Sequence, residues 1–128
     1  MHSPTGKQIF EGEIANYWFD NDILVSDSKS IRRTVENIRG NVALVKQLTN
    51  NKKVPLLIYL KRSPVPDKAT RKFSSEQLPV IYKAMAMVSE PGLAQLIMSI
   101  LFKFRKPPIP MKSFFNDQDA KEWLKQFI

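Results

Sequence analysis

The sequence contains no cysteine, a single histidine and four glycines among its 128 residues. The lack of cysteine excludes disulfides, thiolate nucleophiles and zinc sites built on thiolates. The one histidine, His2, lies in an N-terminal stretch that we expect to have no fixed geometry, so Ser–His catalysis is excluded. The few glycines form no phosphate-binding loop. Because no nucleophile or acid–base set can be assembled, we expect a protein that is not an enzyme and that uses no metal or cofactor.

Long hydrophobic runs are also missing from the chain. No stretch approaches the ~20 apolar residues that span a bilayer, and no apolar run follows Lys7 as in a signal peptide. We therefore expect a cytoplasmic protein without a transmembrane segment. The length suits a single domain over residues 1–128, in which residues 1–8 form a flexible N-terminal segment.

The net charge of +8 is concentrated in the middle third of the chain. Residues 29–72 carry twelve Lys or Arg and two acidic residues, whereas residues 1–28 have a net charge of −4. Such asymmetry indicates either an anionic partner or a solvated basic surface. The basic residues come in pairs, such as Lys52–Lys53, rather than in a stripe with interleaved aromatic residues. We therefore do not expect nucleic-acid binding.

Hydrophobic spacing predicts a β-hairpin followed by alternating helices and strands. Apolar residues over 14–25 flank the turn-forming residues 20–22, which predicts the hairpin. Gly40 inside the first predicted helix costs ~1 kcal/mol relative to Ala, which predicts a local reason for its presence. After the hairpin we predict a helix over about 30–48, capped by Ser28 or Ser30, and then a strand over 54–61. Residues 67–82 are predicted to form one broken or two short helices, with Pro79 starting the second, and residues 84–88 a strand. The last predicted elements are a helix that opens at 89–91 and ends at Phe104, an edge strand over 109–115 and a helix capped by Asn116.

Two uninterrupted apolar runs, Leu56–Leu60 and Ala84–Val88, predict strands that are buried on both faces. Helices that alternate with such strands call for a mostly parallel sheet. We therefore predict a single-domain α/β fold, with an N-terminal β-hairpin followed by αβαβα units. The mixed sheet is expected to have about four or five strands, with its central parallel strands covered by helices.

The second half of the chain carries a family resemblance. Four segments are the basis of this resemblance: the predicted strand Lys83–Val88, the following helix with Leu96 and Phe102, the proline-framed segment Lys106–Phe115 and the Ala-x-x-Trp-Leu pattern of Ala120–Leu124. Together with the strand at 54–60 and the helix at 30–48, these segments resemble the SpoIIAA-like, or STAS-type, small bacterial proteins over residues 13–128. The resemblance implies their α/β fold, a non-enzymatic role and the binding of a protein partner or an apolar ligand.

The segment after the first central strand is a candidate site. Anti-sigma-factor antagonists of the wider fold carry a phosphorylated Ser or Thr there. This chain has Lys61–Arg62–Ser63 at that place, so the resemblance implies a phosphorylation switch at Ser63 alone. The flanking Asp and Gly of the family pattern are absent. Lys61, Arg62 and Ser63, with the predicted helix start at Ser89–Gly92, also form a candidate anion site, because ligands gather at the carboxyl ends of parallel strands. Ordinary loop polarity is the alternative.

The predicted helix over 91–104 is apolar on more than one side. Beside the stripe that contains Leu93 and Ile97, a second patch consists of Ala94, Met98 and Phe102 next to Leu101. Three explanations stay open: neighbouring elements that cover both sides, a self-association surface, or the wall of an apolar pocket. We predict a homo-oligomer on this basis.

Two functions remain possible for such a protein. The first is a non-catalytic regulatory or interaction module that binds a protein partner, and the alternative is a small carrier or sensor of an apolar or lipid-like ligand. A large closed cavity would favour the carrier, and a flat apolar surface would favour the partner. Asp20, Asp22 and Asp27 resemble a cation site only superficially, since their spacing lacks the loop of a calcium hand, and we predict a hairpin turn there.

Overall fold

The computed structural model describes residues 6–103 and 105–128. Within them the chain forms a six-stranded sheet whose strands lie side by side in sequence order. β1 (Phe10–Glu11), β2 (Ala15–Asp20) and β3 (Ile23–Ser28) pair antiparallel, and β4 (Val54–Tyr59), β5 (Tyr82–Val88) and β6 (Met111–Phe114) extend the sheet in parallel from β3. The predicted α/β class with its hairpin and mixed sheet is confirmed, but the sheet has six strands rather than four or five.

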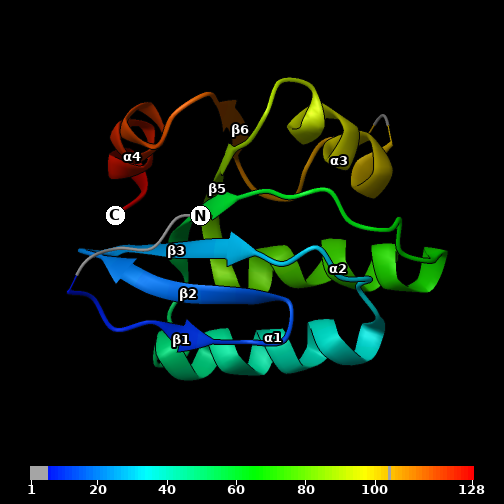
Figure 1. Ribbon diagram of the computed structural model, residues 1–128, viewed down its shortest axis with the longest axis horizontal. Helices are drawn as coiled ribbons and strands as arrows, with labels where there is room; N and C mark the ends of the chain where they lie inside the picture. The colour runs from blue at the N-terminus through cyan, green and yellow to red at the C-terminus, as the bar shows by residue number, and fades with distance from the viewer. Residues whose placement is uncertain (1–5, 104) are drawn as a thin grey trace.

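Helices cover both faces of the sheet (Figure 1). The crossover helices α1 (Val35–Leu48), α2 (Lys68–Ile81) and α3 (Leu93–Phe102) contact one another in turn and pack on one face. The last helix, α4 (Asp117–Leu124), packs on β4, β5 and β6 from the other face and ends in a short 3-10 helix, η1 (Lys125–Phe127). The sheet therefore separates two hydrophobic clusters, and the larger one lies beneath α1, α2 and α3.

Side-chain size alternates along β5 and distinguishes the two faces. Ala84 and Ala86 belong to the cluster beneath α4, whereas Met85 and Met87 belong to the cluster beneath the three crossover helices. Successive residues of a strand point to opposite faces, so the small alanines let α4 approach closely while the long, adaptable methionines fill the other face. Both predicted central tracts are confirmed as inner strands with nearly continuous burial.

Helix starts differ from the sequence prediction. α1 begins at Val35 rather than near Ser30, because Thr34 is the N-cap and its hydroxyl accepts from the amide of Asn37 while the Asn37 side chain accepts from the Thr34 amide. α3 begins at Leu93 rather than at Ser89, since Gly92 adopts a left-handed φ of 86° that ends the preceding turn.

The prediction of a broken helix around Pro79 is wrong. α2 is one continuous helix capped by Asp67, and Pro79 lies in its last turn. A proline there removes one internal hydrogen bond, but only two residues of the helix, Val80 and Ile81, come after it. Packing does not explain Gly40, because an added Cβ would meet no described atom beyond its own stretch of helix within 4 Å.

Some predictions lie outside the described residues. These are residues 1–5 of the expected flexible segment, with His2 among them, and Phe104, the expected end of the third helix. Among the described helices, none combines the length and hydrophobicity needed to cross a membrane.

Candidate functional site

A pocket of about 270 Å³ lies between the sheet and the three crossover helices. Its walls come from β2, β3, β4 and β5 on the sheet side and from α1, α2 and α3 on the helix side. It reaches the surface at residues 61–65, which are exposed and belong to the segment between β4 and α2. This segment, residues 60–66, is called the mouth loop below. The pocket therefore opens at the carboxyl ends of the parallel strands, where α/β sheets commonly bind ligands.

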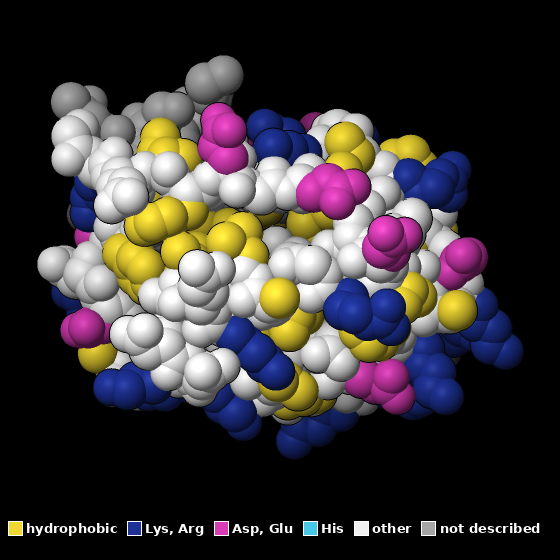
Figure 2. All heavy atoms as spheres, turned by 90° about the horizontal axis from the view of Figure 1, so that it is seen from below, with side chains coloured by type: hydrophobic (Ala, Val, Ile, Leu, Met, Phe, Trp, Pro, Cys, Tyr) yellow, Lys and Arg dark blue, Asp and Glu magenta, His cyan; other side chains and the backbone are white. Residues whose placement is uncertain are grey.

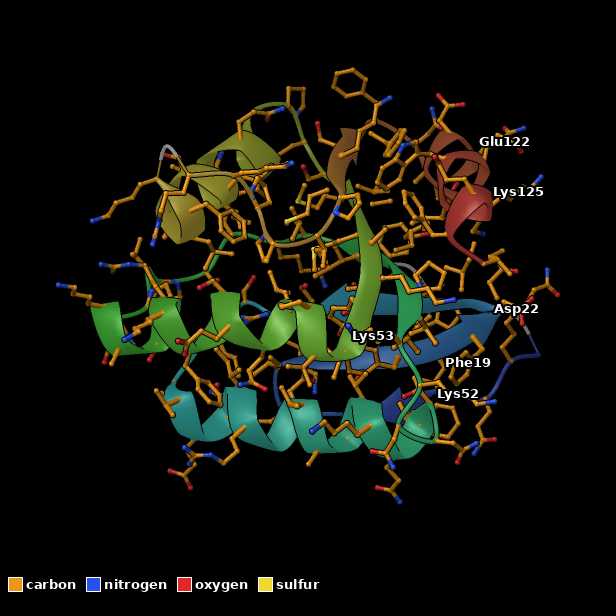
Figure 3. The ribbon with its side chains drawn as sticks, turned by 180° about the vertical axis from the view of Figure 1, so that it is seen from behind. Phe19, Asp22, Lys52, Lys53, Glu122 and Lys125 are labelled. Atoms are coloured by element: carbon orange, nitrogen blue, oxygen red, sulfur yellow. The ribbon has the colours of Figure 1, made fainter. Side chains whose placement is uncertain are left out.

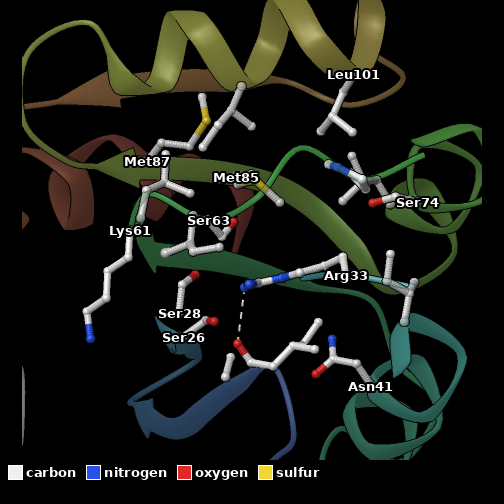
Figure 4. Close-up of a pocket in the computed structure, with 18 of the residues that line it drawn as sticks. Ser26, Ser28, Arg33, Asn41, Lys61, Ser63, Ser74, Met85, Met87 and Leu101 are labelled. Atoms are coloured by element: carbon white, nitrogen blue, oxygen red, sulfur yellow. Dashed lines mark hydrogen bonds between the residues drawn. The ribbon is translucent and has the colours of Figure 1, made fainter. Parts of the chain in front are cut away.

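Most of the pocket wall is apolar because the sheet turns its larger hydrophobic residues to this side. Leu56 and Ile58 of β4 and Met85 and Met87 of β5 line it from the sheet, and Leu101 lines it from α3 (Figure 4). Leu57, between Leu56 and Ile58, points to the opposite face and belongs to the cluster under α4. An apolar wall with a few convergent polar groups is the usual composition of a small-molecule site.

A buried hydrogen-bonded pair of tyrosines lies at one end of the pocket. The Tyr17 hydroxyl donates to Oδ1 of Asn41 with 2.8 Å between the oxygens, and Tyr82 hydrogen-bonds Tyr17. Burial raises the pKa of Tyr17, and burial together with the neighbouring Tyr17 raises the pKa of Tyr82 well above its usual value. Both phenols are therefore neutral near neutral pH and act as polar, uncharged groups.

Arg33 extends across the pocket toward Ser26 and Ser28 (Figure 4). It belongs to the segment between β3 and α1, directly before the N-cap. Its Nη1 donates to the carbonyl oxygens of Lys29 (2.5 Å) and Ile31 (2.7 Å), and its Nη2 donates to the carbonyl oxygen of Ile14 (3.1 Å). Burial lowers the pKa of Arg33, which still leaves an arginine charged at neutral pH. The guanidinium thus brings a fixed positive charge into a largely apolar pocket.

The other cations that line the pocket have acidic partners. Lys61 Nζ lies 3.4 Å from Oδ1 of Asp27, and Arg62 Nε donates to Oε1 of Glu90 at 2.6 Å. The second pair joins the mouth loop to the segment before α3. The mouth loop is also fastened by Arg32, whose Nη1 donates to the carbonyl oxygen of Val65 at 3.0 Å.

The structure separates the residues predicted on α3. Leu101 lines the pocket, whereas Ala94 and Phe102 are 1% and 4% exposed and belong to the hydrophobic core, with half-buried Met98 packed against it. The predicted stripe that contains Leu93 and Ile97 also lines the pocket. A charged residue in place of Phe102 would therefore destabilise the core, so such a variant could not test self-association through α3.

The predicted candidates after β4 lie together at the pocket mouth. Lys61, Arg62 and Ser63 all line it and are exposed. A phosphate on Ser63 remains a prediction. Asp22 lies in the predicted β2–β3 turn with Asp20 directly before it, whereas Asp27 lies within β3. Asp20 pairs with Lys121 at 2.6 Å.

Sequence reasoning missed the polar end of the pocket, which consists of Arg33, Ser26 and Ser28 beside Tyr17 and Asn41. Arg33 was counted only as part of a basic segment, and Ser28 only as a possible helix cap. A signal was present, since Ser26 and Ser28 alternate on an inner strand and are 2% and 3% exposed. Polar residues repeated at a period of two on a buried strand mark a polar stripe on one face.

Among residues 6–103 and 105–128, the basic side chains away from the pocket are scattered over the surface. A more open hollow lies at the amino ends of β4 and β5, with the exposed Lys52 and Lys53 on its rim near Phe19 and Asp22 (Figure 3). On the face seen from below, Lys and Arg side chains are scattered among acidic, neutral and hydrophobic ones (Figure 2). This distribution suits a solvated basic surface.

Comparisons with known proteins agree with the architecture. A family model described as "Domain of unknown function (DUF7793)" matches residues 17–128. Among solved structures, the chain is similar to an uncharacterized protein of the DUF3478 family with a SpoIIAA-like fold from Shewanella loihica PV-4, with 18% identity, a TM-score of 0.56 and coverage of 97% of this chain and 98% of that one. No curated protein matches the chain. The SpoIIAA-like fold predicted from the sequence is thereby confirmed.

Proposed function

Since the chain belongs to the DUF7793 family, whose description assigns no function, we propose from its own geometry that the protein binds a small apolar or amphipathic molecule, as a carrier or sensor. The observation that supports this most is the pocket of about 270 Å³ inside the larger hydrophobic cluster. Well-packed interiors leave few voids larger than a water molecule. A pocket of this size is close to the lower limit of ordinary small-molecule sites, which is ~300 Å³.

The lining supports binding rather than catalysis. The described residues around the pocket include hydroxyls, amides and cations, but no carboxylate, thiol or imidazole. A general base must lie within hydrogen-bond reach of the proton that it removes. We therefore propose a non-catalytic role for this site.

Calorimetric titration with 1-octanol, an uncharged probe with a short apolar tail, tests the proposal. Leu101→Trp places a larger ring at the pocket wall and should weaken or abolish binding. Val80→Trp is the matched control, because Val80 is 43% exposed on α2 and does not line the pocket. Binding to the wild type and to Val80→Trp, with loss in Leu101→Trp, is expected. No binding to the wild type, or equal binding to all three proteins, would contradict the proposal.

A protein partner is the second candidate function. Val65 of the mouth loop and Leu96 of α3 both line the pocket and are 55% and 48% exposed, so apolar side chains surround its opening. Such a rim supports an apolar contact with a partner or a second copy. Light scattering coupled to size exclusion tests self-association. Leu96→Glu should lower the mass of an oligomer. A monomeric wild type would exclude self-association, and binding to a different protein would then be the candidate.

A further inference from the structure

The polar end of the pocket contains a cation without a counterion. Arg33 takes part in none of the ion pairs among the described residues. Lys61 and Arg62 are paired with Asp27 and Glu90. Arg33 is therefore the one unbalanced charge among the described residues that line the pocket, and burial makes such a charge costly.

Arg33 also keeps free hydrogen-bond donors. A guanidinium has five N–H groups. Three of the five donate to the carbonyl oxygens of Lys29, Ile31 and Ile14, and the Nε–H and one Nη2–H have no acceptor among the described residues. The backbone contacts fix the guanidinium, so the two remaining donors are presented with little further loss of side-chain entropy.

Ser28 adds a hydroxyl beside the guanidinium. It is 3% exposed and lines the pocket, yet its hydroxyl has no hydrogen-bond partner among the described residues. Figure 4 shows the Arg33 side chain extending toward the side of the pocket where Ser26 and Ser28 lie, and Arg33 bonds the carbonyl oxygen of Lys29, the residue after Ser28. An acceptor placed between Arg33 and Ser28 would give both residues a further hydrogen-bond partner.

We propose that this polar end binds the carboxylate of an organic monoanion whose apolar tail lies along Met85, Met87 and Leu101. The proposal rests on the pocket being a ligand site. One unbalanced positive charge suits a carboxylate better than a phosphate dianion. Planar N–H donors and a hydroxyl suit the lone pairs of a carboxylate. With ~30 Å³ for each group of water size, the pocket of about 270 Å³ holds roughly nine such groups, which corresponds to a chain of about eight carbons and its head group.

Four probes with the same tail and different head groups test the sign and number of charges. Octanoate is a monoanion, 1-octanol is neutral, octylammonium is a cation and octyl phosphate is close to a dianion. Calorimetry on the wild-type protein should rank octanoate first, with octanol about ten- to a hundredfold weaker, since a hydrogen bond to a charged group contributes more than a neutral one. Octylammonium should bind most weakly. Equal affinity for octanoate and octanol, or tighter binding of octyl phosphate, would overturn the inference.

Variants locate the head group. Arg33→Met should bring the affinity for octanoate down to that for octanol, and Ser28→Ala should weaken octanoate alone. Arg39→Met is the matched control: Arg39 lies on α1 over the ring of Phe73 and does not line the pocket, so its loss should leave all four affinities unchanged. Unchanged octanoate binding in both Arg33→Met and Ser28→Ala would contradict the assignment.

The outcomes separate this inference from the proposed function. Binding of octanol without any preference for octanoate leaves the apolar site and removes the carboxylate. Failure of all four probes removes both. If Arg33→Met does not fold, the ranking of the probes on the wild-type protein and the Ser28→Ala result still decide.

Discussion

The hydroxyl of Tyr17 donates a hydrogen bond to Oδ1 of Asn41 over 2.8 Å and thereby ties β2 to α1 at the polar end of the pocket. Tyr17 is 2% exposed, and the two residues are 24 positions apart in the sequence. The bond fixes how α1 lies over the sheet and so helps to define the pocket wall. The cavity and the packing of the fold therefore depend on the same contact.

Replacing Tyr17 by Phe should lower the free energy of unfolding by about 1 kcal/mol, because the amide of Asn41 loses its buried partner. Replacing both residues, as in Tyr17→Phe with Asn41→Leu, should cost less than the sum of the two single changes. Denaturant unfolding of the four proteins gives the coupling between the residues. Fully additive costs would show that the bond contributes nothing to stability.

The three tyrosines of the chain should resist alkaline titration. Burial raises the pKa of Tyr17, Tyr82 and Tyr59, and Tyr59 also donates to a carboxylate oxygen of Asp117. The folded protein keeps these protons above pH 10, where the unfolded chain loses them. The free energy of unfolding should therefore fall as the pH rises past 10, and these groups should not affect it below pH 10. Ultraviolet absorbance should show tyrosinate only as the protein unfolds. Reversible ionisation near pH 10 with intact circular dichroism would contradict this.

Two glycines should respond to alanine in opposite ways. Gly40 lies in the interior of α1, is exposed and has open space around it, so Gly40→Ala should raise the free energy of unfolding by about 0.5–1 kcal/mol. At Gly12 an added Cβ would lie 2.7 Å from the backbone oxygen of Ala15, so Gly12→Ala should destabilise. Denaturant unfolding measures both changes. A loss of stability in Gly40→Ala would contradict the prediction.

The ion pair across the pocket mouth should affect kinetics more than stability. Arg62 and Glu90 are both exposed, and such pairs contribute ~0–1 kcal/mol. Arg62→Gln should therefore change stability little and accelerate the release of a bound probe by up to about fivefold, since the pair fastens the mouth loop. Lys125→Gln is the control, because it removes the exposed pair with Glu122 on the far side of the sheet (Figure 3). Line-shape analysis by NMR gives both rates, and equal rates would argue against a closing role.

Local sequence patterns predicted the inner strands of the sheet. The orientation of α3 and the presence of β1 depend on long-range packing and could not be predicted from local patterns. The continuous apolar runs of β4 and β5 can only be buried on both faces, so their place follows from composition. α3 is apolar on several sides, so its pattern could not say which side meets the core, and the structure buries Ala94 and Phe102 while Ile97 faces the pocket. β1 has only two residues and carries no pattern of its own.

The same limit applied to the site. Lys61, Arg62 and Ser63 could be placed at the mouth because they follow a central strand. Arg33 could not, since its position depends on backbone carbonyls as far away as Ile14, a contact that no local spacing encodes. The unpaired state of Arg33 is visible only once its neighbours are known.

Leu56 and Leu57 provide the most direct test of the claim that the pocket is a ligand site. They are neighbours in β4, both almost fully buried, and Leu56 lines the pocket while Leu57 packs beneath α4. In a methyl-resolved NMR titration with octanoate, the account predicts saturable shifts for the methyl groups of Leu56 and of Met85, and essentially none for those of Leu57. Shifts of equal size for Leu56 and Leu57, or no shifts at any concentration, would contradict it.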